Sequence, residues 1–103
     1  MYVCKPTYFD VMVKGQNVYM TQKTPVCANK AQAEHENLVQ NLRSFGVRVK
    51  SVEPLEGLHD MVFAANGALV HAESKKAVVA NFSVPARMKE SVSWEARLVE
   101  DGY

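Results

Sequence analysis

The pattern of apolar and polar positions divides the first half of the chain into strand-like and helix-like stretches. Two short apolar runs, at residues 2–4 and 9–13, open the chain, and the second alternates at strand period. Between Pro25 and Gly46 the apolar residues instead recur every three or four positions, which is typical of an amphipathic helix. Pro suits the start of a helix and Gly suits its end. A β-rich segment at residues 47–52 follows, and the order strand, helix, strand predicts a right-handed crossover onto one sheet.

The second half begins with an apolar run that is broken by Asn66 and Gly67. Residues 61–64 are predicted as a buried strand, and the Asn-Gly pair is predicted to supply the positive φ of a sharp bend. A type I′ hairpin turn at the same pair is the alternative interpretation. Residues 68–70 and 76–82 then predict an antiparallel hairpin with a polar tip between them.

The helix predicted after Pro85 carries two apolar seams. Trp94 and Leu98 form one seam, which we expect to be covered by another module, a partner or another copy of the chain. The seam that we expect to pack on the sheet is longer and comprises Met88, Val92, Ala96 and Val99.

Composition restricts the class of protein. A chain of 103 residues is enough for a single domain, residues 1–103, with a modest core. Twelve basic and eleven acidic residues give a net charge of +1, so nothing favours a nucleic-acid partner. No apolar run approaches the ~18 residues needed to span a bilayer, and the N-terminus lacks the apolar core of a signal peptide. We therefore expect a cytoplasmic protein with no membrane partner.

The spacing of cysteine and histidine gives no sign of a metal or cofactor. Cys4 and Cys27 are far apart and are expected to be reduced thiols. His35, His59 and His71 fall on different predicted elements, and none belongs to a His-x-x-x-His or Cys-x-x-Cys pair. We expect no metal and no cofactor, and a structural role for His35 at the edge of the first helix stripe.

Five segments, in order, resemble the guanidino-group-modifying enzyme superfamily, which comprises amidinotransferases, dimethylargininases and arginine deiminases. The most distinctive segment is residues 60–70, Asp-Met-Val-Phe-Ala-Ala-Asn-Gly-Ala-Leu-Val. The remaining segments cover nearly all of the rest of the chain: a Cys-x-Pro-x-x-Phe-Asp-Val pattern at 4–11, a relative of Asn-Pro-Trp-Met at 17–20, a Phe-x-x-Pro-x-Arg-x-x-Glu pattern within 81–90, and a helix at 94–103.

The resemblance implies a fold as well as a function. The superfamily fold is an α/β propeller (pentein) of five β-β-α-β-type modules around a pseudo-fivefold axis. The chain would form a partial propeller of about two modules, an α/β (α+β) domain with a mixed sheet and two main helices. Strand edges exposed by such a truncation tend to pair with something, so we expect a homo-oligomer.

Three residues take substrate-binding roles if the resemblance holds. Asp60 matches an acid that contacts the guanidino or amino-acid part of the substrate, and Asn66 matches a position in the same pocket. Arg87 matches the arginine that pairs with the substrate carboxylate; a purely structural salt bridge between Arg87 and Glu90 is the alternative. Carboxylates bind planar guanidinium groups and the arginine fork binds carboxylates, so an arginine-like small molecule fits these roles. Ala65 and Asn66 replace the adjacent acidic pair of dimethylargininases, which argues against dimethylarginine as the substrate.

The superfamily attacks the guanidinium carbon with a cysteine thiolate and uses a histidine as general acid and base. In the family both residues follow the region matched here, so no residue of this chain is predicted to be catalytic. Three hypotheses result. The chain is a truncated, non-catalytic and oligomeric relative; or it is the substrate-recognition half of a hydrolase or amidinotransferase whose catalytic half is on a companion chain or is missing from this sequence; or it is an adaptor that binds a protein through Trp94 and Leu98.

Overall fold

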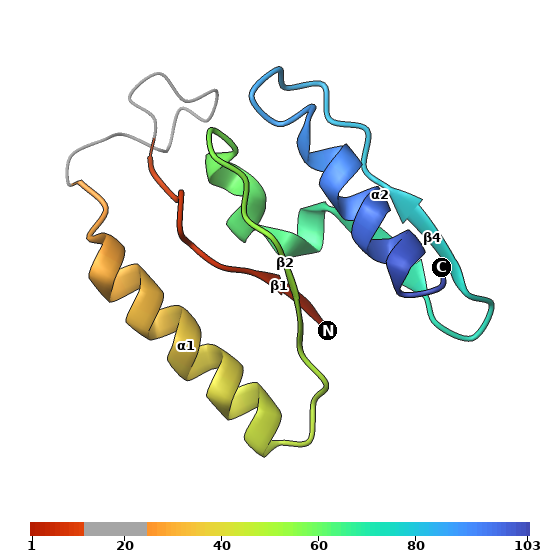
Figure 1. The fold of residues 1–103 in the computed structure, drawn as a ribbon, viewed down its shortest axis with the longest axis horizontal. Coiled ribbons are helices and arrows are strands. Elements are labelled where there is room, and N and C mark those ends of the chain that lie inside the picture. The colour runs from red at the N-terminus through yellow and green to blue at the C-terminus, as the bar shows by residue number, and fades with distance from the viewer. Residues whose placement is uncertain (12–24) are drawn as a thin grey trace.

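A computed structural model describes residues 1–11 and 25–103 of the chain. Figure 1 shows a mixed α/β arrangement, with α1 beside the β1–β2 pair and α2 beside β4. The elements, in order, are β1 (Tyr2–Cys4), α1 (Ala28–Ser44), β2 (Lys50–Val52), the 3-10 turns η1 (His59–Val62) and η2 (Ala64–Asn66), β3 (Ala68–His71), β4 (Lys76–Val79) and α2 (Glu90–Glu100).

The strand–helix–strand unit predicted for the first half is confirmed. β1 and β2 pair in parallel, with Tyr2 opposite Lys50 and Cys4 opposite Val52, and α1 connects them along the chain. The strand predicted at residues 9–13 is not formed at 9–11, and residues 12–13 lie outside the described part, as does the connection at 14–24.

The first helix ends where its sequence predicts. Gly46 has a φ of +79°, and its N–H donates to the Arg43 carbonyl at 2.9 Å. The N–H of Val47 donates to the Leu42 carbonyl at 3.0 Å, so the last carbonyls of α1 are satisfied by a glycine-terminated cap.

The packing of α1 is looser than its apolar stripe predicts. No residue of α1 is fully buried, and Leu38 is 52% exposed. His35 and Val39 line a cavity of about 310 Å³ between the helix and the first sheet. Burial lowers the pKa of His35, and the positive charge of Lys5 adds to this effect.

The strand predicted at residues 61–64 is wrong. This segment forms two consecutive 3-10 turns, in which the N–H of Phe63 donates to the Asp60 carbonyl at 3.0 Å and that of Asn66 to the Phe63 carbonyl at 2.9 Å. The turns bury Met61 while Phe63 stays 43% exposed, a distribution that period-two alternation cannot produce. The predicted mixed sheet is also wrong, since the described strands make two separate two-stranded sheets.

The positive φ predicted for the Asn-Gly pair is also wrong. Gly67 has an ordinary helical φ of −74° and is buried. Glycine is required there for space, since a Cβ on Gly67 would overlap the indole ring of Trp94.

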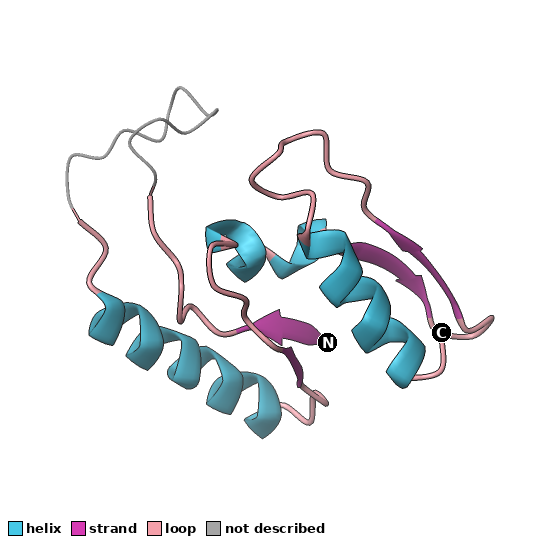
Figure 2. Ribbon diagram, turned by 45° about the horizontal axis from the view of Figure 1, so that its top comes forward, coloured by secondary structure: helices cyan, strands magenta, loops and turns pink. Residues whose placement is uncertain are grey.

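The hairpin is confirmed. β3 and β4 pair antiparallel, with Ala68 opposite Val79 and His71 opposite Lys76. Figure 2 shows α2 lying along this hairpin. The hydroxyl of Ser91 donates to the Ala80 carbonyl at 2.6 Å, which ties the first turn of α2 to the residue that follows β4.

The seam of α2 that faces inward is the opposite of the one predicted. Trp94 and Leu98 are 2% and 3% exposed, whereas Val92 is 69% exposed. The buried stripe starts with a charged residue, Glu90, which is fully buried one turn before Trp94. Trp94 packs with the other buried core residues Cys4, Val52, Leu58 and Met61.

The residue after α2 links that helix to the first sheet. Asp101 accepts hydrogen bonds from the Tyr2 hydroxyl at 2.6 Å and from Arg97 Nε at 3.1 Å, and its other oxygen lies 2.6 Å from Lys50 Nζ. β1, β2 and α2 therefore meet at one carboxylate. In the part of the chain that the structure describes, no helix is long and apolar enough to cross a membrane.

Candidate functional site

The three residues singled out by sequence lie together. Asp60 belongs to η1, Asn66 ends η2, and Arg87 lies in the turn before α2. Arg87 Nη1 donates to Asn66 Oδ1 at 3.3 Å, and Arg87 Nη2 donates to the Asp60 carbonyl at 3.4 Å. The Asp60 carboxylate lies 3.9 Å from Arg87 Nε. Residues separated by 27 positions thus meet around one guanidinium group.

The carboxylate of Glu90 binds the same guanidinium group. Arg87 Nε and Nη2 donate to the two carboxylate oxygens of Glu90 at 2.8 and 2.9 Å, a bidentate fork. Glu90 is fully buried, and the Arg87 side chain is 14% exposed. Hydrogen bonding to Glu90 raises the pKa of Arg87, although burial opposes the rise. The face of the guanidinium stacks over the ring of Phe82, 4.3 Å from its centroid. The salt-bridge alternative for Arg87 is therefore present in the structure.

The bonds to described residues leave one N–H group of Arg87 that could donate to a ligand. Four of the five N–H groups of a guanidinium donate to Glu90, Asn66 and the Asp60 carbonyl. Among the described residues, one N–H of Nη1 has no acceptor. Asn66 uses its Oδ1 towards Arg87, so its amide N–H groups point elsewhere on an exposed side chain. The site thus keeps N–H donors on two residues, Arg87 and Asn66, that are joined to each other by a hydrogen bond.

The carboxylate of Asp60 is more exposed than that of Glu90 and is bonded less closely to Arg87. Its side chain is 38% exposed, and no described donor reaches its carboxylate within hydrogen-bonding distance. The ion pair with Arg87 at 3.9 Å is long, and such partly exposed pairs contribute little energy. The Asp60 carboxylate can therefore accept hydrogen bonds from a cation.

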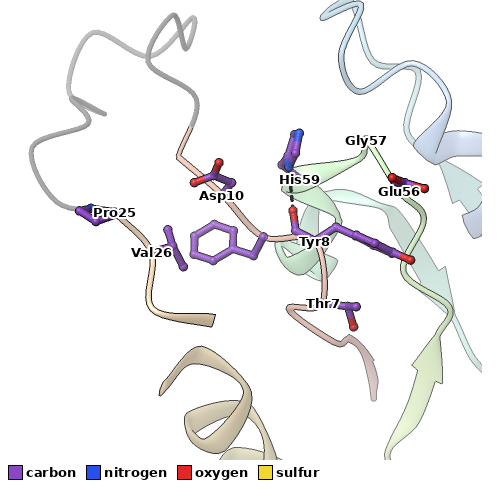
Figure 3. A pocket seen from close by; sticks show the side chains of 9 residues that line it. Thr7, Tyr8, Asp10, Pro25, Val26, Glu56, Gly57 and His59 are labelled. Atoms are coloured by element: carbon purple, nitrogen blue, oxygen red, sulfur yellow. Dashed lines mark hydrogen bonds between the residues drawn. The ribbon is translucent and has the colours of Figure 1, made fainter. Parts of the chain in front are cut away.

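A separate open cavity of about 470 Å³ is lined by His59, the first residue of η1, and by residues from three other segments of the chain. Figure 3 shows its lining: Asp10 and Val26 lie on one side of the Tyr8 carbonyl, and Glu56 lies on the other. His59 Nδ1 lies 2.7 Å from that carbonyl, so this nitrogen carries the proton of the ring's neutral form. None of the three site residues predicted from sequence lines this cavity.

The cysteines and His71, in the part of the chain that the structure describes, do not form a catalytic or metal centre. Cys4 is buried, and burial raises the pKa of its thiol to about 11. Cys27 is exposed at the start of α1. His71 Nδ1 contacts the Ser74 hydroxyl at 2.8 Å in the hairpin tip. Within residues 1–11 and 25–103, no group of three or more His, Cys, Asp or Glu side chains is placed to hold a metal ion.

Sequence reasoning missed Glu90 as a member of this cluster. It named Glu90 as a salt-bridge partner but gave it no place in the buried face of α2. The available signal was the spacing of Glu90, Trp94 and Leu98 at intervals of four, which puts all three on one helical face. The stacking of Phe82 on Arg87 left no signal in the spacing.

Comparison with known proteins gives the family. The family profile described as N,N dimethylarginine dimethylhydrolase, eukaryotic, matches residues 5–101. The chain belongs to this dimethylarginine dimethylhydrolase family. The resemblance to guanidino-group-modifying enzymes is thereby confirmed.

One named protein and several solved structures are similar to this chain over almost its whole length. The N(G),N(G)-dimethylarginine dimethylaminohydrolase of Mycobacterium tuberculosis is 35% identical over 102 residues, which is 99% of this chain and 33% of that protein. The N-terminal domain of ArgZ, a cyanobacterial arginine dihydrolase crystallised with its substrate, matches with a TM-score of 0.86 and 27% identity. AgrE, crystallised with ornithine and NAD+, matches with a TM-score of 0.84 and 26% identity.

The coverage of these matches is unequal. The chain is 99% covered in each structural comparison but spans 36% of the ArgZ N-terminal domain and 14% of the AgrE chain. It spans about a third of the length of the mycobacterial relative. The fold is therefore a mixed α/β unit that matches one part of the N-terminal domain of ArgZ.

Proposed function

We propose that this chain forms the substrate-recognition part of a C–N hydrolase or amidinotransferase that acts on an arginine-like small molecule. The observation that carries the proposal is the convergence of Asp60, Asn66 and Arg87 around one guanidinium group, with a partly exposed carboxylate on Asp60 and an exposed amide on Asn66. The ligand class is supported by the solved relatives, since ArgZ was crystallised with its substrate and AgrE with L-arginine.

Each group of the ligand has a counterpart at the site. The carboxylate of Asp60 binds the cationic guanidinium or amino group, and it is accessible because its side chain is 38% exposed. The free N–H of Arg87 and the amide of Asn66 donate to the ligand carboxylate. The two ends of a zwitterionic arginine-like molecule are thus bound by groups of opposite character.

The nucleophile comes from outside these 103 residues in this proposal. A cysteine attacks as its thiolate, and burial of Cys4 keeps that thiol protonated at neutral pH. The hydrogen bonds of His59 and His71 go to Tyr8 and Ser74, and neither involves a cysteine. The catalytic cysteine and histidine belong either to the rest of the same polypeptide or to a companion chain, which together with this unit would complete the α/β propeller.

Thermal melting with L-arginine tests the proposal. Binding to the folded form alone raises its stability, by about 2.7 kcal/mol at a ligand concentration a hundred times the Kd. Asp60→Asn should abolish the rise in Tm. The substitution replaces a negatively charged carboxylate, which has two acceptor oxygens for the ligand cation, with a neutral amide that has one. Asp10→Asn is the matched control, since Asp10 lines the separate open cavity.

The results for the two variants distinguish binding at Asp60 from binding in the open cavity lined by Asp10. A Tm rise that survives Asp10→Asn and disappears in Asp60→Asn supports the proposed site. The reverse result would move the site to the cavity beside Tyr8. A wild-type Tm that is indifferent to L-arginine and to other guanidino compounds would contradict the recognition function itself.

A second candidate function is self-association through the outer face of α2, in a non-catalytic oligomer. The observation that favours it is the exposure of Val92 and Val99 on one face of this helix, at 69% and 64%, and of Met88 in the turn before it, at 55%. The adaptor hypothesis that used Trp94 and Leu98 is wrong, because both side chains are buried in the core.

Solution mass tests the second candidate. Val92→Lys should convert an oligomer to monomer by light scattering, since a charge would have to be buried at the contact. Leu38→Lys, at an exposed apolar position of α1, is the control and should leave the mass unchanged. A monomeric wild type at high concentration would rule out this candidate.

A further inference from the structure

Glu90 is the one charged residue in the described part of the chain that is completely buried, and it contacts Arg87 of the candidate site. It is the first residue of α2, where the positive end of the helix dipole favours a carboxylate. Both of its oxygens are used by Arg87, at 2.8 and 2.9 Å. A purely surface salt bridge would leave the arginine free to change rotamer, whereas this one fixes the plane of the guanidinium group.

The orientation set by Glu90 determines where the other N–H groups of Arg87 point. With Nε and one side of Nη2 on Glu90, Nη1 is directed to Asn66 at 3.3 Å and the second N–H of Nη2 to the Asp60 carbonyl at 3.4 Å. The ring of Phe82, 4.3 Å from Arg87 Cζ, covers one face of the same plane. These contacts fix the plane of the guanidinium group, so they also fix the direction of the one N–H of Nη1 that has no acceptor among the described residues.

Helix α2 makes a second contact with the same loop. Trp94 lies one helical turn after Glu90 and packs on Gly67, the residue after Asn66. The indole N–H of Trp94 is buried and has no hydrogen-bond partner among the described residues, so this contact is made by shape and not by a polar bond. Two residues of α2 thus act on this loop, Glu90 through its bonds to Arg87 and Trp94 through its contact with Gly67.

From these contacts we propose that Glu90 is the positioning residue for ligand-carboxylate recognition. It holds Arg87 so that one N–H of Nη1 and the Asn66 amide face the ligand together. This inference rests on the proposed function, because it assigns a source of specificity within the same site. Glu90 itself touches no ligand.

Binding of two probes distinguishes positioning from general damage to the fold. L-arginine has both the guanidinium and the carboxylate, and agmatine is the same molecule without the carboxylate. Glu90→Gln should weaken L-arginine binding to the full chain about tenfold, because one ligand hydrogen bond is lost. It should leave agmatine binding, which uses Asp60, within about twofold.

Glu100→Gln is a matched control on the same helix. Glu100 also pairs with an arginine three residues before it, at 3.4 Å from Arg97, but its side chain is 71% exposed. This variant should change neither affinity. If Glu90→Gln weakens both probes equally, or leaves L-arginine binding unchanged, the positioning role is wrong.

An NMR measurement separates failure of this inference from failure of the proposed function. The side-chain amide resonances of Asn66 report its bond to Arg87, so they should shift in Glu90→Gln and not in Glu100→Gln. Unchanged Asn66 resonances would overturn the positioning role whether or not a ligand binds. Shifted resonances in a chain that binds neither probe would refute the recognition function and, with it, the ligand-carboxylate role, while the Glu90–Arg87–Asn66 geometry would stand.

A second variant covers the case in which Glu90→Gln does not fold. Arg87→Lys keeps a cation beside Glu90 but lacks the Nη1 group that reaches Asn66. It should lose the preference for L-arginine over agmatine. A retained preference would overturn the inference.

Discussion

At the scale of single residues, Gly67 joins the site to the core. Its φ of −74° suits any residue, but a side chain there would overlap Trp94. Gly67→Ala should therefore destabilise the fold by about 1–3 kcal/mol through overpacking, measured by urea unfolding. In a Trp94→Phe background the smaller ring gives room, and the same substitution should cost clearly less. Costs that simply add in the double variant would show that the two residues do not compete for space.

Residues of the site differ in how far the sequence predicts them. Asp60, Asn66 and Arg87 were named from a resemblance, and the structure brings them together although their roles stay a prediction. The burial of Glu90 was not predicted, because a charged side chain signals a solvent-facing position unless its partner is known to be buried with it. The consequence is practical: removing the Arg87 side chain would leave Glu90 buried and unpaired, so Arg87→Ala cannot test binding without also testing the fold.

At the scale of elements, the predictions succeeded where periodicity and capping agree. α1 has a helical apolar period and a glycine with φ +79° at its end, and both its presence and its end are confirmed. Residues 61–64 have a short apolar run without a decisive period, and a short run does not separate a strand from a buried turn. The inward face of α2 was misassigned because four apolar residues outnumber two, although Trp94 buries more surface than any of them.

At the scale of the whole molecule, Asp101 joins both ends of the described fold. Its side chain is 8% exposed and accepts bonds from Tyr2 of β1 and Arg97 of α2, with Lys50 of β2 at 2.6 Å. Hydrogen bonds from Lys50, then Tyr2 and Arg97, lower the pKa of Asp101 to about 2 from its ordinary 3.8. Burial, with the bond to Asp101, raises the pKa of Tyr2 to about 12 from 10.0.

These shifts fix the pH range in which the cluster stabilises the fold. The pKa of Asp101 is lower in the folded than in the unfolded chain, so its contribution is complete above about pH 4 and is lost as the pH falls towards 2. The pKa of Tyr2 is raised, so its contribution is complete below pH 10 and is lost as the pH rises through 12.

Asp101→Asn should therefore destabilise the protein at pH 6 and converge with the wild type near pH 2, where the wild-type carboxyl is itself becoming neutral. Urea unfolding at a series of pH values measures the difference. Glu95→Gln, at an exposed position of α2, is the control and should give a small difference at every pH. If the cost of Asp101→Asn were the same at pH 2 as at pH 6, hydrogen bonding by the neutral group and not its charge would hold β1, β2 and α2 together.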